Sequence, residues 1–214
     1  MLTLWWRLIR FGFRLLYNEL AWTYDWVSWG VSLGHWRKWQ RHALIYLDQG
    51  VDAHVLELAH GTANLQLDMA RAGWRSIGLD LSPFMGRIAR IKLSRAGIEP
   101  RLVRGSAFHL PFADASFTYI VSTFPTEFIV QPETIREVHR VLKPGGRLVV
   151  VLNGMLTAVN PLVAALEWLY RVTGQRGPLP LDPFQQFREG GLELQLHVDD
   201  LPGSKCWVLV ADKG

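Results

Sequence analysis

The stretch Val55–Leu65, "VLELAHGTANL", decides the fold, because it joins a buried strand to a helix through a tight turn. Apolar residues run up to Leu58 and enclose one carboxylate, Glu57, and a helical pattern begins at Asn64. A glycine-rich turn in this position is typical of loops that bind a nucleotide-like cofactor. Between Leu58 and Asn64, however, Gly61 is the only glycine. The stretch alone therefore does not separate a cofactor loop from an ordinary strand-turn-helix.

Beyond this stretch, short apolar runs alternate with amphipathic ones, which predicts a parallel sheet with crossover helices. The expected strands are Ala53–Leu58, Arg75–Leu79, Pro100–Val103, Phe117–Ser122 and Arg147–Leu152. The expected helices are Asn64–Arg71, Pro83–Ala96 and Pro132–Leu142. Gly73 and Gly97 stand where glycines commonly follow the end of a helix. The chain is thus expected to be an α/β protein.

The C-terminal third has a different pattern. Pro161–Val172 is expected to be an apolar helix, and Thr173–Phe184 is rich in Pro and Gly and is expected to be a loop or lid. The segment "GLELQLHVDDLPGSKCWVLVADK" then predicts two strands joined by a turn at Leu201–Ser204. A hairpin at the end of a parallel sheet requires one antiparallel strand.

The composition bounds the class of protein. The 214 residues, 49% hydrophobic and 20% charged, suit one globular α/β domain. The net charge of +4 comes from residues 1–42, where six Arg and Lys face two acidic residues; this favours an anionic membrane surface over nucleic acid. The single cysteine, Cys206, excludes an internal disulfide and fits a reducing, cytoplasmic location. The scattered histidines have no metal-ligand spacing, so no metal is expected.

The first twenty residues, "MLTLWWRLIRFGFRLLYNEL", predict an amphipathic helix. Arg7, Arg10, Arg14 and Asn18 recur every three or four residues and form one polar stripe on an otherwise apolar helix. These arginines interrupt any run long enough to span a bilayer, and no signal-peptide cleavage site follows. The helix either lies at the inner face of a membrane or folds over the domain as a lid. We expect residues 1–45 to form such N-terminal helices and residues 46–214 to form the main domain.

Four motifs in order carry a resemblance. They are "VLELAHGTA" from Val55, "GLDLSP" (Gly78–Pro83), "GSAFHLPFADASFTYIVSTF" (Gly105–Phe124) and "REVHRVLKPGGRLVVV" (Arg136–Val151). Together they resemble the class I S-adenosylmethionine-dependent methyltransferases, over roughly residues 50–214. The resemblance implies a Rossmann-like, seven-stranded, mostly parallel sheet with a C-terminal antiparallel hairpin strand.

The resemblance also implies a cofactor site beyond the carboxyl ends of the strands. Gly61 would let the backbone approach the cofactor, and Asp80, nineteen residues later, would bind the ribose hydroxyls or merely cap the next helix. Glu57 would orient the loop and the methionine end. The full set expected to bind S-adenosylmethionine is Tyr24, Glu57, Ala59, His60, Gly61, Asp80, Leu81, Ser106, Ala107 and Phe108, the last three beside the adenine.

Three positions depart from the family pattern. Ala59 and Ala63 replace loop glycines, and Ser106 replaces an acidic residue beside the adenine. Alanine disfavours a positive φ, so it is compatible with the turn if the backbone at both positions lies in ordinary regions, and we expect a lower affinity for the cofactor without loss of binding. A nicotinamide enzyme is rejected, because its third loop glycine would be Asn64 here.

The N-terminal segment indicates the methyl acceptor. Tyr24–Leu44 is similar to the segment before the cofactor domain of ubiquinone and menaquinone methyltransferases, through Tyr24, Asp25, Ser32, Gly34, His35 and Trp39. Seven of the ten tryptophans lie in the first 39 residues and suit a lipid-like substrate. We expect a membrane-associated methyltransferase that acts on a quinone precursor or phospholipid. A soluble small-molecule O- or N-methyltransferase and a non-catalytic scaffold with this fold are the alternatives.

Methyl transfer from a sulfonium needs alignment and a dry site, and a general base only where the acceptor must lose a proton. The candidate bases are His35, His60, His109 and Glu127. Sequence gives no geometry that selects among them.

Overall fold

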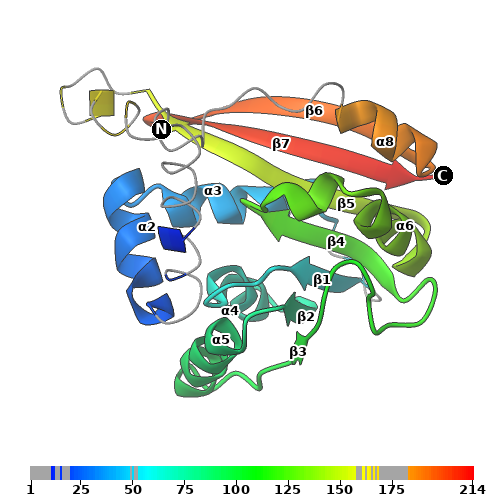
Figure 1. The fold of residues 1–214 in the computed structure, drawn as a ribbon, viewed down its shortest axis with the longest axis horizontal. Helices are drawn as coiled ribbons and strands as arrows, with labels where there is room; N and C mark the ends of the chain where they lie inside the picture. Colours follow the sequence, from blue (N-terminus) through cyan, green and yellow to red (C-terminus); the bar gives the residue numbers. More distant parts are fainter. Residues whose placement is uncertain are drawn as a thin grey trace.

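The apolar runs assemble into one seven-stranded sheet in the computed structural model (Figure 1). The structure describes residues 11, 12, 15, 20–48, 50, 53–157, 161, 163, 164, 166, 168 and 183–214. The strands are β1 (His54–Leu58), β2 (Arg75–Asp80), β3 (Leu102–Arg104), β4 (Phe117–Thr123), β5 (Leu142–Leu156), β6 (Leu192–Leu201) and β7 (Ser204–Lys213). They lie in the order β3-β2-β1-β4-β5-β7-β6.

The order and direction of the strands confirm the expected fold class. β1 pairs in parallel with both β2 and β4, so the strand order reverses between β1 and β4. β2 and β3 pair in parallel, as do β4 and β5. β7 runs antiparallel between β5 and β6, with Leu201 opposite Ser204 at the hairpin turn. Ligands of open parallel sheets bind at such a reversal, beyond the carboxyl ends of the strands.

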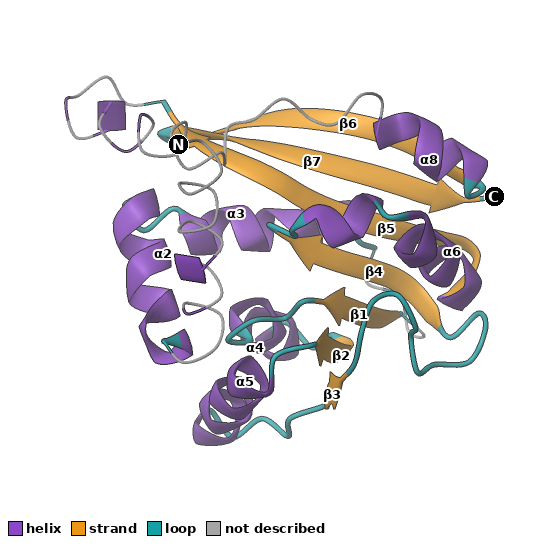
Figure 2. Cartoon of the chain, viewed as in Figure 1, coloured by secondary structure: helices purple, strands orange, loops and turns teal. Residues whose placement is uncertain are grey.

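Helices cover both faces of the sheet. They are η1 (Ala21–Thr23), α2 (Tyr24–Ser32), α3 (Trp36–His42), η2 (Ala43–Tyr46), α4 (Asn64–Arg71), α5 (Pro83–Arg95), η3 (Glu127–Val130), α6 (Pro132–Val141) and α8 (Pro183–Glu189). α6 and α8 pack on one face, and α3 and α4 pack on the other. In Figure 2, α2 lies beyond the end of the sheet toward which the arrowheads of β1 and β4 point.

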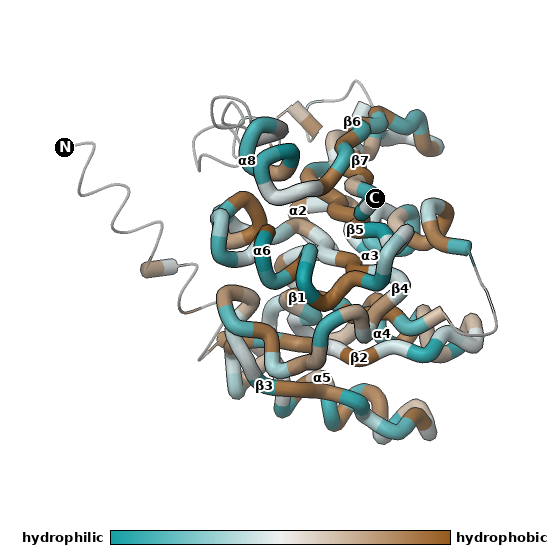
Figure 3. Tube along the Cα trace, turned by 90° about the vertical axis from the view of Figure 1, so that its right-hand side faces the viewer, coloured by the Kyte–Doolittle hydropathy of each residue, from teal (hydrophilic) through white to brown (hydrophobic). Residues whose placement is uncertain are grey.

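The alternation of side chains along the strands explains the two layers. In β1, Leu56 and Leu58 pack with α6, whereas Val55 packs with α3 and α4. All three are fully buried, because the strand is covered on both faces. In Figure 3 the brown, apolar stretches run through the strand layer, while α8 is largely teal.

Several predicted boundaries need correction. β5 is far longer than Arg147–Leu152, because β7 pairs with it as far as Leu156. Gly154, inside this extension, makes room for Trp39: a Cβ there would lie 2.2 Å from the indole. β3 begins two residues later than predicted and ends at Arg104, which pairs with Asp80.

The C-terminal third contains one helix that the sequence does not predict. Helix α8 was not predicted, since Thr173–Phe184 was interpreted as a loop and the helix begins at Pro183. Most of the expected helices over residues 1–20 and 161–172 lie outside the described residues. No helix within the described part of the chain is long and apolar enough to cross a bilayer.

Candidate functional site

The turn after β1 carries three left-handed residues. Gly61 has φ +54°, and Ala59 and Ala63 have φ +57° and +64°. The condition stated for the two alanines, ordinary backbone angles, is therefore not met. The turn keeps the shape of a glycine-rich loop, and the surrounding structure imposes that shape on alanine at a cost of about 1–2 kcal/mol per residue.

Asp80 holds this turn in place. Its Oδ2 accepts a hydrogen bond from the Gly61 backbone N–H at 2.9 Å, and its Oδ1 accepts one from the Ser82 N–H at 2.8 Å. Ser82, not Asp80, is the N-cap of α5, since its Oγ accepts from Met85 N. Simple helix capping thus does not account for Asp80. Its carboxylate joins the ends of β1 and β2, next to the place where the strand order reverses between β1 and β4.

His60 lies inside the turn and is 4% exposed. Its Nδ1 is 2.8 Å from the Gly61 carbonyl, so this nitrogen carries a proton and donates. Burial lowers the pKa of His60 and favours the neutral ring. Gly78 is required beneath it, because a Cβ there would lie 2.9 Å from His60 Cδ2. The ring thus contributes to the internal structure of the turn.

Glu57 lies in β1 under α4 and is 1% exposed. Its Oε2 accepts from Gln66 Nε2 at 2.8 Å, and Gln66 Oε1 accepts from Ser76 Oγ at 2.9 Å. Burial raises the pKa of Glu57 to about 8, outweighing the Gln66 hydrogen bond. The side chain thus anchors the beginning of α4, as a mostly neutral acid at pH 7.

The loop after β3 is held by α6. Arg140 donates to the carbonyls of Leu110 and Phe112, and Glu137 accepts from the Leu110 N–H at 2.6 Å. The Ser106 Oγ accepts from the Phe108 N–H at 3.2 Å within the turn. Ala107 lies in this turn and is partly buried. The structure explains how the loop is ordered, and its contact with adenine stays a prediction.

Two apolar side chains lie exposed on the loops that follow β2 and β3. Leu81 is 67% exposed and Phe108 is 39% exposed. Arg104 Nε donates to the Leu81 carbonyl at 3.3 Å, which links the two loops. Exposed apolar groups beside a carboxylate suit a base and a ribose.

Helix α2 is attached to the turn by a polar cluster that the sequence indicated only in part. Asp25 Oδ1 accepts from Thr62 Oγ1 at 2.6 Å and from Asn64 Nδ2 at 3.0 Å. Lys92 Nζ, from α5, donates to Asp25 Oδ2 at 2.6 Å, to Thr62 at 3.0 Å and to Asn64 at 2.8 Å. The sequence pattern singles out Asp25 beside Tyr24. It does not point to Lys92, Thr62 or Asn64, because no spacing links residues on separate elements.

Tyr24, also expected at the cofactor, packs within an aromatic group. Its ring meets Trp36 edge-on at 6.4 Å, and Trp36 stacks on Phe124 at 3.9 Å. Phe124 follows β4 with φ +52°, so this stack lies at the carboxyl end of the sheet. The structure brings Tyr24 near the carboxyl ends of the strands, and its contact with the cofactor stays a prediction.

Beside this stack two buried polar atoms lack partners. Among the described residues they are Trp36 Nε1 and Gln40 Oε1, with Thr134 Oγ1 elsewhere. Gln40 Nε2 donates to Thr123 Oγ1 at 3.1 Å, at the end of β4. An unpaired donor and an unpaired acceptor, one turn apart on α3, are costly unless a ligand satisfies them.

The other candidate bases do not gather around the turn. The Nδ1 of His35 lies 3.1 Å from Ser204 Oγ, at the hairpin of β6 and β7. His109 is exposed in the loop after β3, and Glu127 is exposed at the start of η3. Cys206 is fully buried in β7, and burial raises the pKa of its thiol to about 12, so it packs as a small apolar residue.

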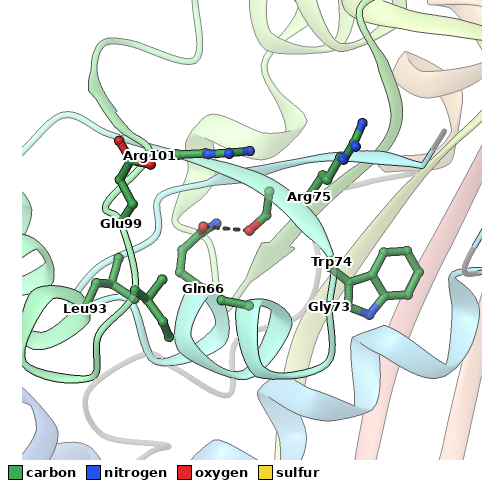
Figure 4. Close-up of a pocket in the computed structure, with 10 residues that line it drawn as sticks. Gln66, Gly73, Trp74, Arg75, Leu93, Glu99 and Arg101 are labelled. Atoms are coloured by element: carbon green, nitrogen blue, oxygen red, sulfur yellow. Dashed lines mark hydrogen bonds between the residues drawn. The ribbon is translucent and has the colours of Figure 1, made fainter. Parts of the chain in front are cut away.

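Two cavities lie at opposite ends of strand β2. One, of about 400 Å³, is lined by His60, Asp80, Ser82 and the exposed side chains of Arg87, Arg90 and Arg104. Figure 4 shows the other, of about 260 Å³, at the amino end of β2 between α4 and α5, with the Gln66–Ser76 hydrogen bond in its wall. Only the first borders the carboxyl ends where ligands of such sheets bind.

Comparison with known proteins relates this chain to the methyltransferases. A family model described as "Methyltransferase domain" matches residues 56–150. A demethylmenaquinone methyltransferase of Thermus thermophilus is 34% identical over 164 residues, which cover 75% of this chain and 72% of that enzyme. The enzyme of the same name from Lactiplantibacillus plantarum is 34% identical over 140 residues; the match covers 63% of this chain and 59% of that enzyme, less than two thirds of its length.

Solved structures agree on the fold. A methyltransferase structure from Bacillus halodurans superposes with a TM-score of 0.61 at 18% identity, covering 81% of this chain and 98% of that one. A geranyl diphosphate methyltransferase, in complex with its substrate and sinefungin, gives a TM-score of 0.60 at 15% identity, covering 82% and 77%. At such identities the likeness concerns the fold alone.

Proposed function

Because the chain belongs to the class I S-adenosylmethionine-dependent methyltransferases, we propose that it methylates a hydrophobic, quinone-like acceptor at a membrane surface. S-adenosylmethionine is the cofactor of this family. The relatives named for demethylmenaquinone support the quinone ring, as does the resemblance of Tyr24–Leu44 to the segment before the cofactor domain of such enzymes.

One observation carries the cofactor site: Asp80 and the Gly61 turn are built as one unit at the strand reversal. The residues fit the cofactor, because a Cβ at Gly61 would meet nothing within 4 Å, which leaves open space before the turn. We place the ribose at Asp80 and the adenine between Leu81 and Phe108, the two exposed apolar side chains.

The protein's part in the reaction is alignment and exclusion of water. When bound, S-adenosylmethionine supplies an electrophilic methyl group and leaves as a neutral thioether. The Asp25 cluster holds α2 over the turn, and the aromatic stack of Tyr24, Trp36 and Phe124 supplies an apolar wall. Such a site lowers the barrier through proximity and desolvation.

The unpaired atoms of α3 support a planar acceptor that carries both a carbonyl and a hydroxyl. The Trp36 Nε1–H would donate to a ring oxygen, and Gln40 Oε1 would accept from a ring hydroxyl. The side chain of Gln40 is already oriented by Thr123. This arrangement favours a quinone or quinol ring over an aliphatic acceptor.

The cofactor site is tested by substitution of Gly61 with valine. Gly61→Val would fill the open space before the turn, and we expect isothermal calorimetry with S-adenosylhomocysteine to detect no binding. The matched control is Gly97→Val, which has φ +72° and equally open surroundings but lies at the end of α5. Wild-type protein that gives no heat at millimolar S-adenosylhomocysteine would overturn the proposal.

The acceptor is tested with methyl-labelled cofactor and a series of quinols. We expect label in a demethylated quinol, and a rise in its KM of roughly tenfold in Gln40→Leu, which removes one buried hydrogen bond. An unchanged KM in Gln40→Leu would refute the role of Gln40. Label only in water-soluble acceptors would favour the soluble small-molecule methyltransferase.

A further inference from the structure

Helix α2 presents its apolar side to solvent. Its inward residues are small or polar: Ala21, just before it, is 2% exposed, Ser28 is 6% exposed and Ser32 is fully buried. Ser32 Oγ donates to the Ser28 carbonyl at 2.6 Å and accepts from the Trp36 N–H at 3.0 Å. A surface helix of a soluble protein normally buries its apolar stripe. Helix α2 does the reverse.

The outward side is aromatic. Its residues and their exposed fractions are Trp22 (69%), Trp26 (77%), Trp29 (64%) and Leu33 (37%). Spacings of four, three and four place them along one side of the helix. Three indoles at about two-thirds exposure leave on the order of 400 Å² of apolar surface in water. A patch of that size commonly marks an interaction site.

The charges near this stripe fit an anionic partner. The helix that follows, α3, carries Arg37, Lys38 and Arg41 and no acidic residue, and Arg37 and Arg41 pair with Asp68 of α4. The acidic residue of α2, Asp25, is paired with Lys92 and contacts the cofactor turn. Lys38 is exposed one helix further on. Tryptophan with nearby basic side chains is typical of the membrane–water interface.

The stripe is next to the proposed active site. Asp25 of the same helix contacts Thr62 and Asn64, and Trp29 follows Asp25 by one helical turn, so the stripe adjoins the side of α2 that faces the cofactor turn. Figure 1 shows α2 beyond the carboxyl ends of β1 and β4. A bilayer under α2 would deliver a lipid acceptor to the site with little exposure to water.

We propose that the outward face of η1 and α2, formed by Trp22, Trp26 and Trp29, docks on an anionic bilayer and places the acceptor site at the lipid surface. The delivery of an acceptor from the bilayer rests on the proposed function. Docking itself is measured as vesicle binding, without the reaction. The inference assigns the membrane contact to Trp22, Trp26 and Trp29, which are separate from the amphipathic segment expected over residues 1–20.

The test uses the full chain and vesicles of phosphatidylcholine with phosphatidylglycerol. We expect Trp26→Ser combined with Trp29→Ser to reduce co-sedimentation by at least about tenfold, because the buried indole area is lost. The matched control combines Ile45→Ser with Leu196→Ser, two exposed apolar side chains on η2 and β6 (66% and 40%), and should bind vesicles like the wild type. Added salt should weaken the binding of the wild type.

The other occupants of the stripe give different results. Equal vesicle binding by the tryptophan variant and the wild type overturns the inference. In that case, a loss of dimer in sedimentation velocity would assign the stripe to a second copy, and a lower unfolding midpoint alone would assign it to residues 1–19. Calorimetry with S-adenosylhomocysteine separates docking from function: a wild type that binds vesicles without the ligand keeps this inference and refutes the proposed function.

Discussion

Glu57 illustrates how a single residue is determined by its surroundings. At the residue level its carboxyl group is enclosed by β1 and α4, with Gln66 as its partner. The fold raises its pKa from 4.5 to about 8, chiefly through burial. Between these values the folded chain holds a proton that the unfolded chain has lost, so the free energy of unfolding falls as the pH rises through this window.

Glu57→Gln should remove that dependence. The variant keeps an acceptor for Gln66 but has no proton to lose, so its stability relative to the wild type should rise by about 1 kcal/mol or more between pH 5.5 and pH 8. Urea unfolding at the two pH values measures the difference. Glu99→Gln, an exposed glutamate, is the control, and a parallel pH response of both variants would contradict the prediction.

The two left-handed alanines make a second prediction at this scale. Ala59→Gly relieves strain at a partly exposed position, so we expect a gain of about 0.5–1 kcal/mol after the entropy cost of glycine. Ala63 is fully buried, and the lost methyl burial of about 0.8 kcal/mol should cancel its gain.

Denaturant unfolding of the Ala59→Gly and Ala63→Gly variants tests the difference in stability, and calorimetry tests the affinity for S-adenosylhomocysteine. Ala115→Gly, at an exposed alanine with φ +51°, should stabilise the protein like Ala59→Gly without changing the affinity for S-adenosylhomocysteine. Ala59→Gly should tighten that affinity, because it frees the turn beside the ligand. A loss of stability in Ala59→Gly would show that the turn does not strain alanine.

At the level of elements, α2 is attached by the hydrogen bonds of Asp25 to Lys92, Thr62 and Asn64 together with the edge contact of Tyr24 on Trp36. Burial raises the pKa of Asp25, but the hydrogen bonds from Lys92 and Thr62 outweigh it and keep the pKa below its ordinary value. The polar cluster therefore contributes to the position of the helix over the turn.

A double-mutant cycle of Asp25→Asn and Lys92→Met measures that attachment. We expect a coupling free energy of about 1 kcal/mol and a weaker affinity for S-adenosylhomocysteine in each single variant. The pair Glu133 and Arg136, 3.5 Å apart and exposed on α6, should show almost no coupling. Additive effects at Asp25 and Lys92 would mean that α2 is held in some other way.

At the scale of the whole molecule, Asp199 ties the N-terminal helices to the C-terminal hairpin. It accepts from Tyr46 Oη at 2.5 Å and lies 2.7 Å from His42 Nε2. Burial raises the pKa of Asp199, but these hydrogen bonds outweigh it and lower the pKa overall. Its contribution to stability is therefore complete at neutral pH and is lost as the pH falls through the lowered pKa.

Asp199→Asn should lower the free energy of unfolding by about 1–2 kcal/mol at pH 7 and by less at about pH 3, which lies below the ordinary pKa of an aspartate. Urea unfolding at both values tests this. Asp200→Asn is the control, since Asp200 is 80% exposed and its ion pair with Lys205 lies at the surface. Equal losses at the two pH values would exclude ionisation of Asp199 as the cause.

The sequence by itself determined the strands of the sheet, the helices between them and their order along the chain, but not α8. Alternating apolar residues and helix-ending glycines are local signals, so α4 was placed at its observed bounds, and Gly73 and Gly97 have the left-handed angles expected of them. The antiparallel strand followed from the hairpin at Leu201–Ser204. The cofactor family followed from four motifs in order.

Only the tertiary structure decided how the polar groups pair and which surfaces remain open. Asp25 and Lys92 are 67 residues apart, and no local pattern joins them. Ala59 and Ala63 adopt angles that their side chains disfavour, because the bond between Gly61 and Asp80 and the packing of α4 impose the turn. The exposed tryptophans of α2 likewise follow from its attachment by a polar inner side. Local propensities are worth tenths of a kcal/mol per residue, whereas buried contacts between distant segments are worth several times more, and these long-range contacts shaped the site.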